Sequence, residues 1–200
     1  MIFNYIFKQL SKMIIMTGLI ASFRSSIISI HNPEIYNIKS IKICDGFPSL
    51  EHVFPKCYMN KNSYNDLHNI YKCNNLINNC RSNYKYTDFS NLNKTIDLYD
   101  FKKLFNTDNY ISNKYKLFIP EEESRGLISR SIMYMSFEYN YKFTKIIDRQ
   151  VLIDWCLKHP PTKNEIHHNH IAFMKQFKRN KFIDLYNKKN YKDYIYKLFS

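Results

Sequence analysis

Glycine and proline are scarce in this sequence, which has three glycines and six prolines among 200 residues. A loop that wraps the phosphates of a nucleotide needs several glycines at close spacing. Neither the dinucleotide-binding pattern nor the P-loop pattern is present. A kinase or a nucleotide-driven motor is therefore disfavoured, and no nucleotide cofactor is expected.

Cysteine is used in a way that disfavours the common zinc folds. None of the five cysteines forms a pair separated by two residues, which is the spacing of zinc ribbons and fingers. Cys73 and Cys80 bracket a short segment and could form a disulfide in an oxidising compartment. In a reducing compartment they would act as small apolar residues, and the sequence leaves both alternatives open.

Acidic residues are few relative to basic ones. The chain has 17 Asp and Glu against 30 Lys and Arg, a formal net charge of +13. Such a charge predicts attraction to a polyanion, because a lysine placed against a phosphate releases condensed counterions. Nucleic acid is the first expectation and an anionic membrane surface the second. The alternative is that many of these lysines only solvate the surface.

Residues 1–30 differ in composition from the rest of the chain. Lys8 and Lys12 precede an apolar run over residues 13–23, and serines follow. This order is typical of a signal peptide, while the run is too short to span a bilayer. We expect either a signal peptide, which implies a secreted or lumenal protein, or a helix packed on the domain of an intracellular one. A single domain is expected over residues 31–190, with a C-terminal tail at 191–200.

Hydrophobic periodicity predicts an α+β fold. A strand is expected over residues 35–44, where apolar and β-branched residues alternate with polar ones. Helices are expected at residues 66–71, 125–141, 148–158 and 162–176.

Particular residues carry these helix predictions. Asp66 is expected near the cap of the first helix. Apolar residues at helical spacing predict a core-facing side for the second, namely Ile128, Ile132, Met135 and Tyr139. Thr162 and Glu165 have the spacing of a capping box at the start of the last.

The residues with the most chemical content lie between positions 51 and 83. His52 is a candidate general base, since a neutral imidazole accepts a proton near physiological pH. Glu51 and Asn78 offer hard oxygen donors suited to Mg²⁺. Neighbours on a strand point to opposite faces, so Glu51 and His52 can serve one centre only if the backbone turns there. Taken singly, each residue is also explained as a surface or turn residue.

Four other histidines attract attention. His68 is a candidate second base or ligand, and a structural hydrogen-bonding role suits it equally well. The run of His167, His168 and His170 suggests a metal site only superficially, because adjacent helical residues do not face the same ion. We interpret that run as phosphate-binding or structural.

Four blocks of sequence, taken together, resemble the motifs of the endonuclease I family, which are nonspecific nucleases of the His-Me (ββα-metal) finger superfamily. The resemblance covers about residues 40–187. The blocks are residues 51–55 (EHVFP), 66–69 (DLHN) with 78–83 (NNCRSN), 125–135 (RGLISRSIMYM) and 169–184 (NHIAFMKQFKRNKFID). The first resembles the catalytic Glu-His-x-x-Pro of the family.

The resemblance implies a ββα-metal finger core with surrounding helices and metal-dependent cleavage of DNA, often RNA too. It implies that His52 is the general base, that Glu51 and Asn78 bind Mg²⁺ or another divalent cation such as Ca²⁺ or Mn²⁺, and that Arg81 is a weaker substrate-binding candidate. Departures from the pattern include Tyr64, at a position that is acidic in some members, and Lys181 in place of a proline. They bear on substrate preference and rate more than on the reaction class.

Three hypotheses follow. The first is a monomeric endonuclease that contacts the backbone of DNA or RNA and has little sequence specificity. The second is a catalytically inactive nucleic-acid-binding protein that retains the fold. The third is a membrane-associated structural protein anchored by residues 1–30.

Overall fold

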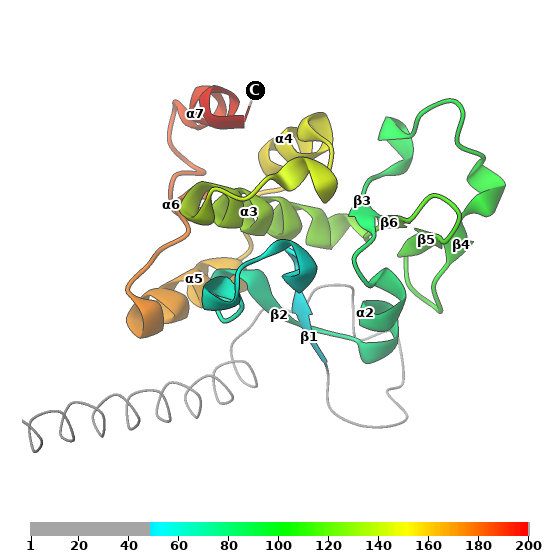
Figure 1. Cartoon of the computed structure of the whole chain (residues 1–200). Helices are drawn as coiled ribbons and strands as arrows, with labels where there is room; N and C mark the ends of the chain where they lie inside the picture. The colour runs from blue at the N-terminus through cyan, green and yellow to red at the C-terminus, as the bar shows by residue number, and fades with distance from the viewer. Residues whose placement is uncertain (1–48, 200) are drawn as a thin grey trace, which may run out of the picture.

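A computed structural model describes residues 49–199 (Figure 1). The strand expected over residues 35–44 and the apolar segment 1–30 lie outside the described residues. Within the described part, no helix is both long enough and apolar enough to cross a membrane. Helices together with two small sheets make an α+β fold, as the sequence predicts.

The first sheet is a two-stranded antiparallel pair, β1 (Ser49–His52) and β2 (Ile70–Cys73), and the helix α2 (Asn75–Arg81) follows it directly. Short 3-10 helices connect the two strands: η2 (Lys56–Tyr58), η3 (Lys61–Ser63) and η4 (Leu67–Asn69).

The helix predicted over residues 66–71 is correct only in its first part. Asp66 caps η4 by accepting a hydrogen bond from the backbone N–H of His68 at 2.9 Å. Ile70 and Tyr71 belong instead to β2. β-branched and aromatic side chains suit a paired, buried strand, and pairing with β1 outweighs the local helical tendency.

The second sheet has four short strands in the order β3-β6-β5-β4. β3 pairs with β6 in parallel, and the other pairs are antiparallel. The strands are β3 (Lys85–Tyr86), β4 (Lys102–Lys103), β5 (Tyr110–Ser112) and β6 (Leu117–Ile119), with η5 (Phe89–Asn91) and η6 (Leu98–Asp100) between β3 and β4.

Five α-helices form the second half of the chain: α3 (Glu122–Tyr139), α4 (Arg149–Lys158), α5 (Lys163–Gln176), α6 (Lys181–Asp184) and α7 (Tyr191–Phe199), with η7 (Phe143–Lys145) before α4. The three helices predicted here from the sequence are confirmed as α3, α4 and α5. Thr162 caps α5 by accepting the N–H of Glu165 at 3.1 Å. The Glu165 carboxylate binds Arg130, so only half of the predicted capping box is present.

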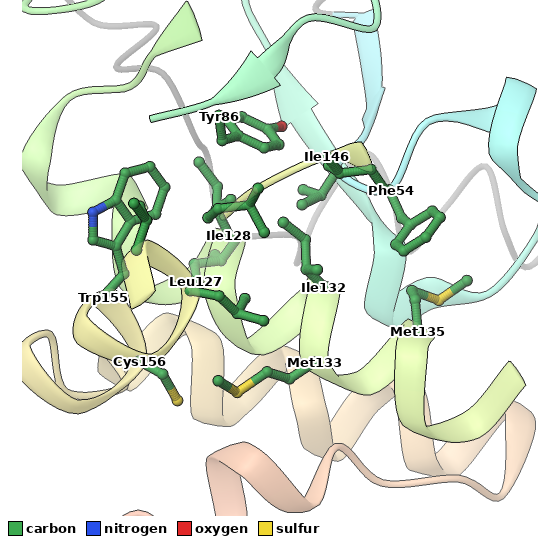
Figure 2. Close-up of a cluster of buried hydrophobic side chains, with 14 of the residues drawn as sticks. Phe54, Tyr86, Leu127, Ile128, Ile132, Met133, Met135, Ile146, Trp155 and Cys156 are labelled. Carbon is green, nitrogen blue, oxygen red and sulfur yellow. The ribbon is translucent and has the colours of Figure 1, made fainter. Parts of the chain in front are cut away.

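Helix α3 runs through the middle of the described structure, with α4 on one side and the β1–β2 pair on the other (Figure 1). Ile128, Ile132 and Met135 are fully buried, as their spacing predicts. They belong to one hydrophobic cluster with Trp155 of α4 and Tyr86 of β3 (Figure 2). Residues 191–199, expected as a tail, form α7, which packs against α4.

Gly126 allows α3 and α4 to approach closely. A Cβ atom at this position would lie 2.6 Å from the backbone oxygen of His159. Arg130, one turn further along α3, donates to the same oxygen at 2.6 Å and to both carboxylate oxygens of Glu165. The Arg130–Glu165 pair is fully buried, and it joins α3 to α5 and to the end of α4.

Asp66 is a junction between distant parts of the chain. Its carboxylate accepts hydrogen bonds from the hydroxyls of Tyr134 and Tyr139 on α3, at 3.0 and 2.7 Å, and from the amide of Gln176 at 2.8 Å. Gln176 also accepts the N–H of Leu67 at 3.0 Å. These bonds fix η4, and with it the start of β2, on helices α3 and α5.

Cys73 and Cys80 are both free thiols. Cys73 is buried, and burial raises the pKa of its thiol. The structure thus favours the second of the two alternatives, in which these cysteines act as small apolar residues.

Two buried histidines, His68 and His168, make the fold sensitive to acid. Each is inaccessible to solvent and donates Nε2–H to a backbone carbonyl, His68 to Lys178 at 3.0 Å and His168 to Leu67 at 2.8 Å. Burial lowers the pKa of His68, and it lowers the pKa of His168 to about 4. The His168 ring therefore stays neutral in the folded protein down to about pH 4, whereas the same ring in the unfolded chain binds a proton below about pH 6.5.

We predict how protonation of His168 changes the free energy of unfolding. Its contribution is constant above pH 6.5, falls as the pH is lowered from 6.5 to about 4, and is constant again below about 4. At about pH 5, the loss from His168 alone should be about 2 kcal/mol, because the unfolded state binds a proton that the folded state does not. Urea unfolding at about pH 7.5 and about pH 5 measures this difference. In His168→Gln, which retains a side-chain N–H donor, the difference should shrink by the same amount, and an unchanged pH dependence would contradict the prediction.

Candidate active site

A pocket of about 450 Å³ lies between β1, α2 and the segment that follows β1. All four residues singled out from the sequence line it, namely Glu51, His52, Asn78 and Arg81. The folding of β1 against α2 thus brings together residues that are far apart in sequence.

Glu51 is buried at the base of this pocket, with 2 % of its surface exposed. Its Oε1 accepts a hydrogen bond from the Arg81 guanidinium at 2.6 Å, and the Tyr86 hydroxyl lies 3.4 Å from the same atom. A buried carboxylate needs such a partner, because an isolated charge in an apolar interior is costly. The negative charge of Glu51 is therefore held in place and compensated.

Arg81 is as buried as Glu51 and binds the protein on several sides. Besides Glu51, its guanidinium donates to the carbonyls of His52 at 3.2 Å, Val53 at 2.9 Å and Ser82 at 3.2 Å. Its Cζ lies 4.4 Å from the centre of the Tyr86 ring. These contacts tie the end of α2 to the end of β1, so Arg81 orients the backbone that carries Glu51 and His52.

His52 is half-buried and its ring is fixed from one side. Nε2 lies 2.9 Å from the carbonyl oxygen of Tyr64. A carbonyl oxygen only accepts hydrogen bonds, so in the neutral ring Nε2 carries the hydrogen and Nδ1 carries the lone pair. The carbonyl of Tyr64 thus selects the tautomer whose basic nitrogen is Nδ1.

The chain bends directly after His52, which meets the condition set by the strand geometry. β1 ends at His52, and the next two residues form a bend. Asn69 clamps this bend, since its Oδ1 accepts the N–H of Phe54 at 2.6 Å and its Nδ2 donates to the Phe54 carbonyl at 3.0 Å. Glu51 and His52 therefore line the same pocket although they are neighbours on a strand.

Asn78 presents its amide oxygen because its amide nitrogen is engaged. Asn74 caps the start of helix α2, and its side chain accepts the N–H of Leu76 at 2.8 Å. One turn later, Nδ2 of Asn78 donates to Ser49 Oγ at 2.9 Å and lies 3.4 Å from the carbonyl of Leu50. The Oδ1 of Asn78 accepts no hydrogen bond from the described residues, and it is a hard oxygen donor.

The oxygen atoms available in the pocket suit a Mg²⁺ ion better than a metal ion whose ligands all come from the protein. Within residues 49–199, no group of three or more His, Cys, Asp or Glu side chains is arranged to hold a metal. Mg²⁺ typically keeps several waters and needs only one or two protein carboxylates. One carboxylate, Glu51, and one amide oxygen, from Asn78, fit that requirement.

The four other histidines singled out from the sequence lie outside the pocket. His68 and His168 are buried structural donors, and His167 and His170 are exposed on α5. Two groups that contact the site residues, the carbonyl of Tyr64 and the hydroxyl of Tyr86, were not predictable from the sequence, because neither belongs to a recognisable motif.

The third and fourth sequence blocks build the framework instead of the pocket. Gly126 and Arg130 join α3 to α4 and α5, as described above. Asn169 accepts the N–H of Asn180 at 2.8 Å, and Asn180 donates to the carbonyl of Arg130 at 3.1 Å. These residues hold the helices against which the β1–β2 pair rests.

Comparisons with known proteins identify the family of the chain. A search of curated proteins gave no match. A family model described as Endonuclease I matches residues 24–186, which are most of the chain and include every residue of the candidate site. The chain therefore belongs to the endonuclease I family, and its activity is that of a nuclease.

Proposed function

We propose that this protein is a divalent-metal-dependent endonuclease that hydrolyses phosphodiester bonds in DNA, and in RNA as well, with little sequence specificity. The observation that carries the proposal is the gathering of His52, Glu51 and Asn78 around one pocket. The order of two antiparallel strands followed by a helix, β1-β2-α2, supports assigning this unit as a ββα-metal finger.

In the proposed mechanism, His52 accepts the proton of the attacking water at Nδ1. The hydrogen bond from Nε2 to the Tyr64 carbonyl holds the ring in this tautomer and stabilises the imidazolium that forms. Arg81 keeps Glu51 and the backbone of His52 in position. Glu51 and Asn78 would hold Mg²⁺, which supplies electrostatic stabilisation of the phosphate and the leaving oxygen when it is bound.

The positive charge of the chain suits this substrate. Contacts between lysines and phosphates carry no sequence information, so cleavage should be sensitive to salt and tolerant of sequence. Residues 31–190 would form the nuclease domain, and a monomer is sufficient because every proposed catalytic group comes from one chain.

Metal dependence is the first test of the proposal. We expect purified protein to convert supercoiled plasmid to nicked and linear forms with Mg²⁺, and to leave it intact in excess EDTA. Asn78→Ala should raise the Mg²⁺ concentration for half-maximal cleavage about tenfold or more, because one of two protein ligands is lost. Asn75→Ala, in an exposed asparagine of the same helix that does not line the pocket, is the matched control. Salt-sensitive plasmid binding by folded wild type without cleavage would overturn the proposal in favour of a binding protein.

A further inference from the structure

A second hollow of about 630 Å³ adjoins the active-site pocket. The two hollows share Ser82 and Asn83, which follow α2. The second is lined further by residues of β3, of the turn before β6 and of η7, and none of the described residues that line it is acidic. The two hollows are therefore adjacent, and a nucleic-acid strand that passes Ser82 and Asn83 would reach the second from the first.

Lysine and tyrosine alternate around this second hollow. Lys116 Nζ lies 5.0 Å from the ring centre of Tyr84 and donates to its hydroxyl at 3.1 Å. Lys145 Nζ lies 5.8 Å from the ring centre of Tyr58. Ammonium groups are attracted to the faces of aromatic rings, so these two long side chains are partly ordered before any ligand binds. Ordering lowers the entropy cost of placing them on a ligand.

A third lysine, Lys85, is already paired with Asp148 at 2.5 Å. Lys116 and Lys145 have no carboxylate partner among the described residues, and both are exposed. They are therefore the two cations of this hollow that are available to an anionic ligand.

Another hollow of similar size is lined by acidic as well as basic residues. That hollow, about 530 Å³ in volume, lies against α4 and shares no residue with the active-site pocket. Its lysines, Lys158 and Lys192, are accompanied by the carboxylates of Asp88 and Asp154. Lysines without accompanying carboxylates thus line the hollow beside the active site, and not the hollow on α4.

We propose that the hollow lined by Lys116 and Lys145 is a subsite for the sugar–phosphate backbone of the nucleic-acid strand as it leaves the active-site pocket. This assignment rests on the proposed nuclease function. Each of the two lysines would bind one phosphate, and the tyrosines would hold the lysines in place. The substrate is then a strand that extends several nucleotides beyond the scissile bond on this side, and a minimal phosphodiester does not occupy the subsite.

The double variant Lys116→Gln/Lys145→Gln tests the subsite. Glutamine keeps a polar side chain that is one atom shorter and removes the charge. Affinity for a labelled single-stranded oligonucleotide is measured in EDTA, where no cleavage occurs, over a range of salt concentrations. We expect about a 20-fold weaker affinity, and a slope of log affinity against log salt that is reduced by about 1.4, since each contact to a single strand contributes about 0.7.

Kinetics with Mg²⁺ provide the second readout. For the oligonucleotide, the double variant should show a higher KM and an unchanged kcat. For the p-nitrophenyl ester of thymidine 5′-phosphate, a minimal phosphodiester, kcat/KM should equal that of the wild type. The matched control is Lys158→Gln/Lys192→Gln, which makes the same change in charge at the hollow on α4 and should bind the oligonucleotide like the wild type.

The outcomes separate the subsite from the function. Equal oligonucleotide affinity in the double variant and the wild type, or an equal loss in the control, would overturn the subsite while leaving the nuclease proposal intact. Absence of Mg²⁺-dependent cleavage of both substrates by the wild type would overturn the function itself. Thermal unfolding of all three proteins confirms that a loss of affinity is not a loss of folding.

Discussion

His52→Ala should lower the rate of Mg²⁺-dependent plasmid cleavage by about 1000-fold, within the usual range for loss of a general base. Among the residues that the structure describes, His52 supplies the only imidazole that lines the active-site pocket, and the substitution leaves none of comparable basicity there to accept the proton of water. The ring is half-buried, so its removal should cost less stability than removal of a fully buried side chain. Initial rates of nicking and the thermal midpoint measure the two effects.

His170→Ala is the control for this experiment, because His170 is exposed on α5 and lines no part of the pocket. It should cleave plasmid at the wild-type rate. If folded His52→Ala retained more than about a tenth of the wild-type rate, general-base catalysis by His52 would be ruled out.

Arg81→Ala should lower the free energy of unfolding by about 3–5 kcal/mol, the usual cost of breaking a buried ion pair. The pair with Glu51 is almost completely shielded from solvent, with side-chain exposures of 1 % and 3 %. The substitution leaves the Glu51 carboxylate in an apolar environment and removes the donors to the His52 and Val53 carbonyls. Urea unfolding at neutral pH measures the loss.

Two further variants show whether burial is the cause. Arg179 forms a partly exposed pair with Asp184, so Arg179→Ala should cost no more than about 1 kcal/mol. The double variant Arg81→Ala/Glu51→Gln should be more stable than Arg81→Ala alone, because the uncompensated charge is removed. A fully stable Arg81→Ala with a raised KM would instead indicate that Arg81 binds substrate directly.

Helices α3, α4 and α5 were predictable because their signals are local. Apolar residues recur at helical spacing in α3, and Thr162 begins α5 with a side chain that caps it. The segment around Ile70 was not predictable in this way. Its strand exists because β1 pairs with it, and β1 lies many residues earlier in the chain.

The residues of the candidate site were identified through the motifs that resemble the endonuclease I family, but their relationships were not. The sequence could not show that Asn69 produces the bend after His52, or that the Tyr64 carbonyl selects the tautomer. The sequence also offered Arg81 as a substrate-binding candidate, which stays a prediction, and it could not show the protein acceptors that its guanidinium binds. Backbone carbonyls and side-chain orientations arise from tertiary packing, which no motif encodes.

The junction at Asp66 has a consequence for the order of events during synthesis. Its carboxylate joins η4 to Gln176, which lies 110 residues later in the chain. A polypeptide is synthesised from its N-terminus. The strand pair that carries His52 has therefore been translated long before Gln176, its anchor on α5. The pocket can therefore acquire its final rigidity only when nearly all of the domain has left the ribosome, which delays the appearance of a competent nuclease until the chain is almost finished.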